Sequence, residues 1–219
     1  MQRWQTMKSN LFPISNNGFR YIFYAFVASV LFKIFDFELL SFLSFVMLFA
    51  IVYFFRNPER EVSIFDAGSV VSPVDGEVVS IEELSDAEYG YKVLVKSGYF
   101  DIGLLRAPCD GYITKVSLQN GARLPITTPS AKALNAQLEL LFKNEKHNTV
   151  KVKHMLTQSF APLSLSVFQS QSIRQSSRYG FLLKGYTEIY IPKNFRLNIN
   201  KGNKLKASQS LLGFFIAIP

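Results

Sequence analysis

The chain has 219 residues, a formal net charge of +8 and 48% hydrophobic residues, including 21 Phe and 10 Tyr. Its single cysteine, Cys109, excludes an internal disulfide and a cysteine-based zinc site, and we expect it to be a small buried residue. Lys and Arg are scattered along the chain and form no nucleic-acid-binding motif, so the positive charge favours anionic lipid or an acidic substrate as the partner.

Two apolar runs follow an N-terminal segment of residues 1–20. They are YIFYAFVASVLFKIF (21–35) and LLSFLSFVMLFAIVYFF (39–55), with only DFE between them. We expect residues 21–55 to form a helical membrane hairpin, although each run is slightly short for a span of about 20 residues. Both runs then either cross the membrane or enter it as a shallow re-entrant pair. A cleaved signal peptide and a helical hairpin buried in a soluble core are the alternatives.

The charges beside these runs predict their orientation. Basic residues lie outside both runs, whereas the connecting turn and its borders carry charges of both signs. The positive-inside tendency places both outer ends in the cytoplasm and the turn on the far side. We therefore expect the protein at the inner, cytoplasmic membrane, with its β domain facing the cytoplasm. The outer basic residues are Arg3, Lys8, Arg20, Arg56 and Arg60.

Residues 56–219 have the pattern of a β domain. Short β-type runs are bounded by Gly, Pro, Asn or Asp. We expect a mainly β fold, a barrel or sandwich of short strands with Asp-Gly turns and one or two short helices, preceded by the helical hairpin. The expected strands are 70–71, 76–82, 92–95, 111–118, 149–154, 163–168, 181–183, 188–191, 196–199 and 212–218.

One helix is expected in this domain, between Ser130 and Phe142. Ser130 can cap it, and Leu134, Leu138 and Leu141 fall on one face at helical spacing. We interpret that stripe as core packing.

The phrase Pro-x-Asp-Gly occurs twice, in SPVDGEVV (72–79) and APCDGYIT (107–114). Pro fixes φ, Asp accepts hydrogen bonds from nearby backbone N–H groups, and Gly allows a positive φ. The repeat therefore predicts two sharp turns into strands. Asp75 and Asp110 are expected to hold these turns.

The two histidines do not form a metal site by their spacing. His147 and His154 are seven apart, and no cysteine or carboxylate lies at ligand spacing. We expect His147 at the surface and His154 as a hydrogen-bonded strand residue.

Several phrases in order resemble the phosphatidylserine decarboxylase family, most closely its short form with an N-terminal membrane hairpin. The resemblance covers about residues 50–219. It implies a proenzyme that cuts itself at a Gly-Ser bond, so that the serine becomes a pyruvoyl group that acts as an electron sink during decarboxylation of phosphatidylserine. The phrases are FFRNPER (54–60), SPVDGEVV (72–79), FDIGLLRAPCDGYITKV (100–116), KNEKHN (143–148) and RYGFLLKGYTEIYIP (178–192).

The resemblance also implies a triad for self-cleavage, with a serine nucleophile, a histidine base and an orienting aspartate. The aspartate falls on Asp75. The histidine position is occupied by Gly103, and the cleavage pair reads Gly185-Tyr186, so the serine is absent. Tyrosine has no β-oxygen to eliminate and cannot yield a pyruvoyl group. Thr187 has one, but cleavage before it would leave a 2-oxobutyryl group.

Three hypotheses follow. The first is a membrane-anchored family member that has lost self-processing and decarboxylase activity and acts as a lipid-binding or regulatory homologue, without a cofactor. The second is an active enzyme with displaced catalytic residues, which alone would require a pyruvoyl-type group. The third is a membrane-tethered scaffold. The expected partner is a phospholipid membrane, including anionic lipid such as phosphatidylserine; a homo-oligomer or an association with another lipid-synthesis protein is compatible with the sequence.

The residues expected around the ancestral site come from three places. Asp75 is a remnant of the triad. Arg106 could bind a carboxylate or phosphate, or else form a salt bridge beside Asp110. Lys184 and Thr187 flank the altered cleavage pair and could contact a lipid headgroup.

Overall fold

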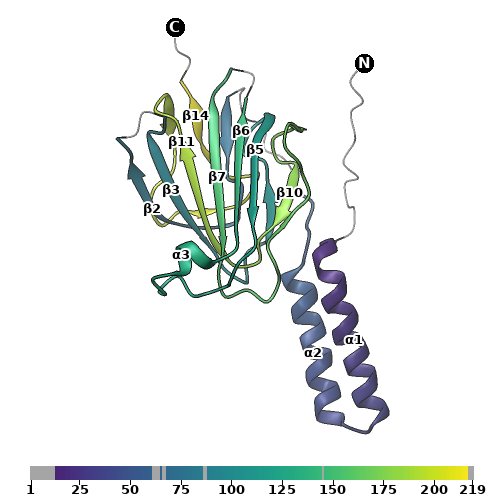
Figure 1. The fold of residues 1–219 in the computed structure, drawn as a ribbon. Coiled ribbons are helices and arrows are strands. Elements are labelled where there is room, and N and C mark those ends of the chain that lie inside the picture. The colour runs from purple at the N-terminus through teal and green to yellow at the C-terminus, as the bar shows by residue number, and fades with distance from the viewer. Residues whose placement is uncertain (1–12, 61–64, 66–67, 86–87, 145, 217–219) are drawn as a thin grey trace. The chain divides into compact units, whose positions relative to one another are not determined.

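A computed structural model describes residues 13–60, 65, 68–85, 88–144 and 146–216 (Figure 1). The chain divides into two compact units, residues 1–59 and 60–219. We call them the hairpin unit and the β unit and describe each by itself. Most of the expected N-terminal segment, residues 1–12, lies outside the described residues.

The hairpin unit consists of a short 3-10 helix η1 (Asn16–Gly18) and two α-helices, α1 (Phe19–Ile34) and α2 (Glu38–Phe54). Asp36, with a φ of 61°, makes the turn between α1 and α2. Hydrogen bonds join the helices in the half nearer their connecting turn, where the Ser41 hydroxyl donates to the Ser29 carbonyl oxygen at 3.1 Å. At the base of the hairpin, the backbone N–H of Ser15 donates to the carbonyl oxygen of Phe55 at 2.8 Å.

The membrane-spanning form of the predicted hairpin is not supported. No helix in the described part of the chain is long and apolar enough to cross a membrane. With 16 and 17 residues, α1 and α2 are about 24–26 Å long, less than the roughly 30 Å of a hydrocarbon core. The alternative of a hairpin buried in a soluble core does not fit either, because Ile51 is the only buried residue of the two helices and Phe23 and Leu39 are 62% and 72% exposed.

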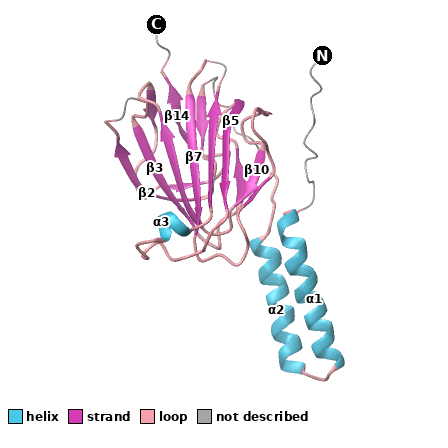
Figure 2. Ribbon diagram, in the orientation of Figure 1, coloured by secondary structure: helices cyan, strands magenta, loops and turns pink. Residues whose placement is uncertain are grey.

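The β unit confirms the prediction of a mainly β fold (Figure 2). Its sheets have the orders β13-β2-β3-β11-β7-β6-β5-β9, β1-β14-β12 and β4-β10-β8. The strands are β1 (Ser69–Val71), β2 (Gly76–Glu83), β3 (Tyr91–Ser97), β4 (Leu104–Arg106), β5 (Gly111–Gln119), β6 (Gln137–Lys143), β7 (Thr149–Leu156), β8 (Ser164–Leu165), β9 (Ser172–Ile173), β10 (Arg178–Phe181), β11 (Gly185–Ile191), β12 (Phe195–Leu197), β13 (Lys204–Leu205) and β14 (Leu211–Phe215).

These sheet orders reveal two halves with the same plan. The inserted half runs without interruption from β4 to β10. The split half consists of β1–β3 and β11–β14. We count the strands of each half in chain order. In each half the first, last and fifth strands form a three-stranded sheet, which is β1-β14-β12 in the split half and β4-β10-β8 in the inserted half. The sixth, second, third and fourth strands follow one another in the large sheet, as β13-β2-β3-β11 and β9-β5-β6-β7. The halves meet where β7 pairs with β11, in an antiparallel ladder.

The two predicted turns occupy matching places in the two halves. The N–H of Val71 donates to the carbonyl oxygen of Pro108, and the N–H of Arg106 donates to that of Pro73, both at 2.9 Å. Each turn is thus held by the strand that leads into the other one. Local two-fold symmetry therefore relates the split half to the inserted half at the level of single hydrogen bonds.

Both turns require glycine, as predicted. Gly76 has a φ of +153° and Gly111 one of +143°, in the region that favours glycine. A β-carbon on Gly76 would lie 2.3 Å from the carbonyl oxygen of Lys96, and one on Gly111 would lie 2.1 Å from that of Lys143. The repeat in the sequence is therefore a repeat in structure.

The helix expected between Ser130 and Phe142 is wrong for most of its length. Helix α3 covers only Ala131–Leu134, and Ser130 makes no side-chain cap. Residues 137–143 form strand β6 instead, with Leu138, Leu140 and Phe142 buried in alternation. The sequence QLELLFK has the period of two that is typical of a strand, which outweighs the helical spacing of the leucines.

Nearly all other expected strands are present, with shifts at their ends. The exceptions are residues 163–168, of which only β8 is a strand, and residues 181–183, of which only Phe181, the last residue of β10, is in a strand. The last expected strand extended to residue 218, and residues 217–219 lie outside the described part. Strands β4, β6 and β9 were not predicted from the sequence. The core lies between the sheets and contains the fully buried Val70, Val95, Leu140 and Ile189.

Candidate functional site

Asp75 lies in the first turn, where its carboxylate is almost fully buried. Arg60 donates to both carboxylate oxygens at 2.6 Å, and the backbone N–H of Ala207 adds a third bond at 2.8 Å. Arg60 also reaches the carbonyl oxygen of Ala207 at 2.8 Å. The two side chains are 9% and 10% exposed. Asp75 therefore holds a buried bidentate ion pair in addition to its turn.

The second predicted turn carries a different aspartate. Asp110 is exposed and accepts one hydrogen bond, from the backbone N–H of Gln175 at 2.8 Å. Cys109 beside it is buried, as expected, and burial raises the pKa of its thiol to about 12, with a further contribution from the charge of Asp110. Asp110 therefore connects its turn to a segment 65 residues further along the chain.

The positions that the resemblance assigns to the triad are linked by contacts at one end of β3 and β11. The Ser97 hydroxyl donates to the carbonyl oxygen of Asp75 at 2.5 Å, and Ser97 is paired with Gly185. Leu182 packs against Gly185 and donates its N–H to the carbonyl oxygen of Gly103 at 2.7 Å. Contacts through Ser97 and Leu182 therefore link Asp75, Gly185 and Gly103, which are far apart in sequence.

The histidine position in this region is filled by another side chain. A β-carbon built on Gly103 would lie 2.8 Å from Cε2 and 2.9 Å from Cζ of Phe181, whose side chain is fully buried. Contacts this short do not occur between real β-carbons and their neighbours. The Phe181 ring therefore occupies the space that a side chain at position 103 would need.

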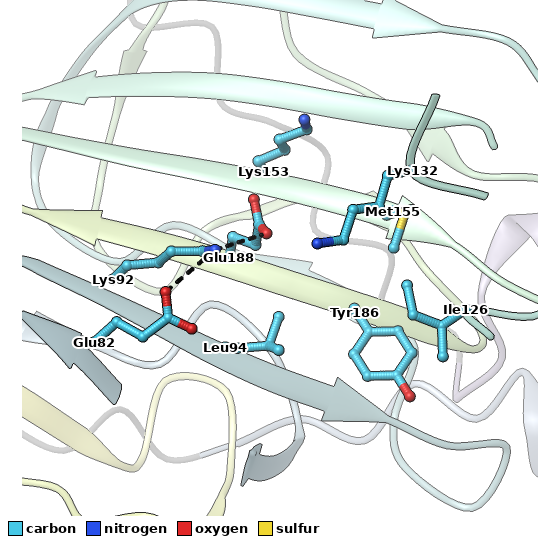
Figure 3. A pocket seen from close by; sticks show the side chains of 9 residues that line it. All are labelled: Glu82, Lys92, Leu94, Ile126, Lys132, Lys153, Met155, Tyr186 and Glu188. Carbon is cyan, nitrogen blue, oxygen red and sulfur yellow. Dashed lines mark ion pairs between the residues drawn. The ribbon is translucent and has the colours of Figure 1, made fainter. Parts of the chain in front are cut away.

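The alternation of β11 separates the two residues after Gly185. Tyr186 lines a pocket on the outer face of the sheet, whereas Thr187 is fully buried on the inner face (Figure 3). The replacement of the family serine by Tyr186 thus places a phenol, which has no β-oxygen, in that pocket.

Thr187 belongs to a buried hydrogen-bonded trio that the sequence did not reveal. Its hydroxyl is 2.8 Å from Nδ1 of His154, and Nε2 of His154 is 2.7 Å from the hydroxyl of Tyr179. All three side chains are fully buried. Burial lowers the pKa of His154 to about 3 and raises that of Tyr179 well above its ordinary value, so His154 is neutral near pH 7.

The expectation that His154 is a hydrogen-bonded strand residue is confirmed. Its partners could not be found from spacing, because they come from β10 and β11, 25 and 33 residues away. The one available signal was the alternation of β11, which turns Thr187 to the face opposite Tyr186. His147, expected at the surface, is exposed and has a φ of 62°.

The other candidate residues lie at separate places. Arg106 is only 4% exposed and donates to the carbonyl oxygen of Ser176 at 3.3 Å. Lys184 donates to Oε1 of Gln158 at 3.1 Å, and its ammonium group lies 5.1 Å from the ring centroid of Tyr99. Neither of the two lines the pocket that contains Tyr186.

This pocket has a volume of about 230 Å³ and is lined by residues of four adjacent strands and of the segment around α3. Lys92 forms ion pairs with Glu82 at 3.6 Å and with Glu188 at 3.3 Å, drawn as dashed lines in Figure 3. The remaining lining residues are Leu94, Ile126, Lys132, Lys153, Met155 and Tyr186.

Comparison with known proteins defines the class to which this arrangement belongs. The family model described as phosphatidylserine decarboxylase matches residues 48–213. The chain therefore belongs to the phosphatidylserine decarboxylase family, as its sequence phrases indicated.

Its relatives carry the name phosphatidylserine decarboxylase proenzyme. The protein from Paraburkholderia xenovorans is 27% identical over 203 residues, which cover 91% of this chain and 95% of the relative. The protein from Nitrosomonas eutropha is 24% identical over 216 residues, covering 95% and 100%. The one from Burkholderia mallei is 28% identical over 171 residues, covering 76% and 79%.

Proposed function

We propose that this chain is a membrane-associated member of its family that neither cleaves itself nor decarboxylates phosphatidylserine, and that it binds phospholipid as a regulatory homologue. The observation that carries this proposal is the filled space at Gly103. Because the ring of Phe181 packs there, the region has no room for the histidine base that family self-cleavage uses.

The residues present also do not fit the family's pyruvoyl group. That group forms from a serine by ester formation and elimination of the β-oxygen, and Tyr186 offers no such oxygen. No serine lies between Arg178 and Pro192. Asp75, which would orient the histidine, has its carboxylate engaged by Arg60 and Ala207. We therefore derive no reaction step through a pyruvoyl group.

Association with the membrane is assigned to the hairpin unit. Both helices present large apolar side chains to their surroundings over most of their length, including Phe26, Phe42 and Phe49 at 54%, 63% and 61% exposure. Such a surface is favourable in lipid and costly in water. We propose that the hairpin enters the cytoplasmic face of the inner membrane as a shallow pair, and that the basic chain favours anionic lipid there.

The intact mass of the full-length protein, purified from its membrane, tests the proposal. We expect a single species at 24.9 kDa, no reaction with hydroxylamine or with borohydride, and no release of CO₂ from phosphatidylserine. Two fragments, the smaller one with a blocked N-terminus, would overturn it. Phospholipid that co-purifies with the single species would identify the ligand.

A second candidate is a self-processing enzyme with displaced catalytic groups, and the hydrogen bond of 2.8 Å between His154 and Thr187 favours it. The Thr187 hydroxyl would attack the carbonyl carbon of Tyr186, with His154 accepting the hydroxyl proton. The peptide C–N bond would break to give an ester and a free amine. Loss of the Cα proton and of the Tyr186 carboxylate, followed by hydrolysis with water, would leave a 2-oxobutyryl group and ammonia.

The position of a break separates the two candidates. Cleavage between Tyr186 and Thr187 that Thr187→Val abolishes would establish the second candidate. The first candidate predicts that the chain remains intact.

A further inference from the structure

A second pocket lies at the Asp110 turn, within the β unit. It has a volume of about 90 Å³ and is mainly polar. Residues from the start of β1, the turn, the end of β6 and the segment after β9 line it. The function proposed above uses none of them. Five of these residues are Gly68, Cys109, Asp110, Asn144 and Gln175.

The sequence repeat of the two turns extends to this pocket. Phe-Asp-x-Gly occurs at residues 65–68 and at 100–103, and its glycine lies seven residues before the turn aspartate each time. The local two-fold symmetry therefore pairs Gly68 with Gly103. A β-carbon on Gly103 would meet the Phe181 ring, whereas one on Gly68 would have no atom within 4 Å. The space that Phe181 fills on one side of the local axis is thus open on the other.

The turn aspartates are held in the same way on both sides of the axis. Oδ1 of Asp75 accepts the N–H of Ala207 at 2.8 Å, and Oδ1 of Asp110 accepts the N–H of Gln175, also at 2.8 Å. On the Asp75 side, the Arg60 guanidinium completes the arrangement by donating to both carboxylate oxygens and to the carbonyl oxygen of Ala207. This set of acceptors therefore already binds a guanidinium at one of its two places.

The corresponding acceptors at Asp110 have no such donor. The second carboxylate oxygen of Asp110 and the carbonyl oxygen of Gln175 accept no hydrogen bond from the residues that the structure describes. The charge of Asp110 acts on the pocket wall, since it adds to burial in raising the pKa of Cys109. A negative charge with open acceptors beside it favours a cation that donates several hydrogen bonds.

The size and chemistry of the pocket select the kind of cation. A volume of about 90 Å³ is far below the roughly 300–1,000 Å³ of sites for drug-sized ligands, so the pocket takes one small group. The described residues include no group of three His, Cys, Asp or Glu side chains that could hold a metal ion. A guanidinium presents a planar fork of donors that matches a carboxylate, whereas an ammonium is a compact point charge.

We propose that the pocket at Asp110 binds a guanidinium group. The Asp110 carboxylate accepts two parallel hydrogen bonds and the carbonyl oxygen of Gln175 accepts a third, as Asp75 and Ala207 do for Arg60. The same chemistry is presented by an arginine side chain of a partner protein and by a free arginine derivative. This site is independent of the proposed lipid binding.

The test uses the full-length protein in a nonionic detergent and two probes, Nα-acetyl-arginine amide and the peptide acetyl-Gly-Gly-Arg-Gly-Gly amide. Calorimetry measures the affinity, and the amide NMR signal of Gln175 locates the site. Asp110→Asn removes the charge. Glu77→Gln is the matched control, because it removes one negative charge from an exposed residue of the same unit outside the pocket. The lysine counterparts of both probes test whether charge alone suffices.

We expect the wild type to bind an arginine probe with a Kd of about 1 mM, because the carboxylate is exposed. Asp110→Asn should bind at least about tenfold more weakly, since hydrogen bonds to charged groups are the strong ones, and Glu77→Gln should differ by less than about twofold. Similar binding of both arginine probes shows that the guanidinium suffices. Binding of the peptide alone identifies an arginine within a polypeptide as the ligand.

Three results overturn the inference. They are no binding of either arginine probe to the wild type, equal losses in Asp110→Asn and Glu77→Gln, and equal affinity for the arginine and lysine probes. Denaturant unfolding of both variants confirms that the loss is not one of folding. If phospholipid binding fails while the arginine probes bind, only the proposed function is lost.

Discussion

The two halves of the β unit share a backbone plan but differ in what they carry. Each has a Pro-x-Asp-Gly turn, a glycine that packs against a neighbouring carbonyl oxygen, and a strand that bonds to the opposite turn. In the split half the turn aspartate, Asp75, forms a buried ion pair with Arg60. In the inserted half Asp110 is exposed and accepts a hydrogen bond from the backbone N–H of Gln175. The same Pro-x-Asp-Gly motif therefore carries a buried, ion-paired aspartate in the split half and an exposed aspartate in the inserted half.

A second difference lies in the core on either side of the β7–β11 pair. Local two-fold symmetry relates Thr187, His154 and Tyr179 to Val150, Ile191 and Leu212 in turn. All six side chains are fully buried, but only the first three are polar. Apolar side chains thus fill the symmetry-related positions in the same molecule. The comparison teaches that this packing does not require the polar trio, which occurs at only one of the two symmetry-related places beside the β7–β11 pair.

Substitution of the two turn aspartates should give the largest difference in stability between the halves. Asp75→Asn is expected to lower the free energy of unfolding by about 3–5 kcal/mol, because it leaves the buried guanidinium of Arg60 without its counter-charge. Asp110→Asn, at an exposed position, should cost less than about 1 kcal/mol. Urea unfolding of the full-length protein in mild detergent measures both. The combination of Asp75→Leu with Arg60→Met should recover most of the loss, and equal effects of the two single Asn variants would contradict the contrast.

The turn glycines should behave alike in the two halves. Gly76→Ala and Gly111→Ala each force a β-carbon against a backbone oxygen at a positive φ, and we expect each to cost about 2–4 kcal/mol. Gly202 is the matched control, because it has a φ of +85° but no atom near its β-carbon position. Gly202→Ala should cost only about 1 kcal/mol in the same unfolding experiment. A large difference between Gly76→Ala and Gly111→Ala would break the proposed equivalence of the turns.

The polar trio can be converted to the apolar set at the symmetry-related place, Val150, Ile191 and Leu212. His154→Ile alone leaves the hydroxyls of Thr187 and Tyr179 buried without this partner and should cost about 1–3 kcal/mol. The triple variant with Thr187→Val and Tyr179→Leu removes those hydroxyls and should regain part of that loss. Denaturant midpoints of the single and triple variants provide the measurement. If the triple variant is the less stable of the two, packing rather than hydrogen bonding sets the cost.

The sequence predicted the features that depend on local chemistry. Both Pro-x-Asp-Gly turns and most strands follow from Gly, Pro and the alternation of apolar residues. That Gly103 and Tyr186 replace the family's histidine and serine is an interpretation of the family phrases, and it stays a prediction. Features that depend on contacts between distant segments could not be predicted. The pairing of His154 with Thr187, the Phe181 ring at Gly103 and the pocket with Lys132 all join residues that the sheet brings together. The expected helix was wrong beyond α3 because Leu134, Leu138 and Leu141 have helical spacing, whereas the buried Leu138, Leu140 and Phe142 follow the period of a strand.

The residue before each turn aspartate provides the most delicate comparison, since Cys109 and Val74 occupy matching buried positions. Burial and Asp110 raise the pKa of the Cys109 thiol to about 12, whereas an unfolded thiol ionises near pH 8.5. The folded pKa is the higher one, so this contribution to stability is complete below about pH 8.5 and is lost as the pH rises toward 12. Relative to Cys109→Val, the wild type should lose about 1 kcal/mol of unfolding free energy between pH 8 and pH 9.5.

Moving the thiol to the split half sharpens this comparison. In a Cys109→Val background, Val74→Cys places the thiol beside Asp75, whose charge is balanced by Arg60. Burial should still raise the pKa of the new thiol, but without the added effect of an unbalanced carboxylate, so the loss of stability with pH should begin at the same pH and end at a lower one. Unfolding free energies of the two single-cysteine proteins across pH 8–10.5 test this. Coincident pH profiles would mean that the buried ion pair does not distinguish the electrostatics of the two turns.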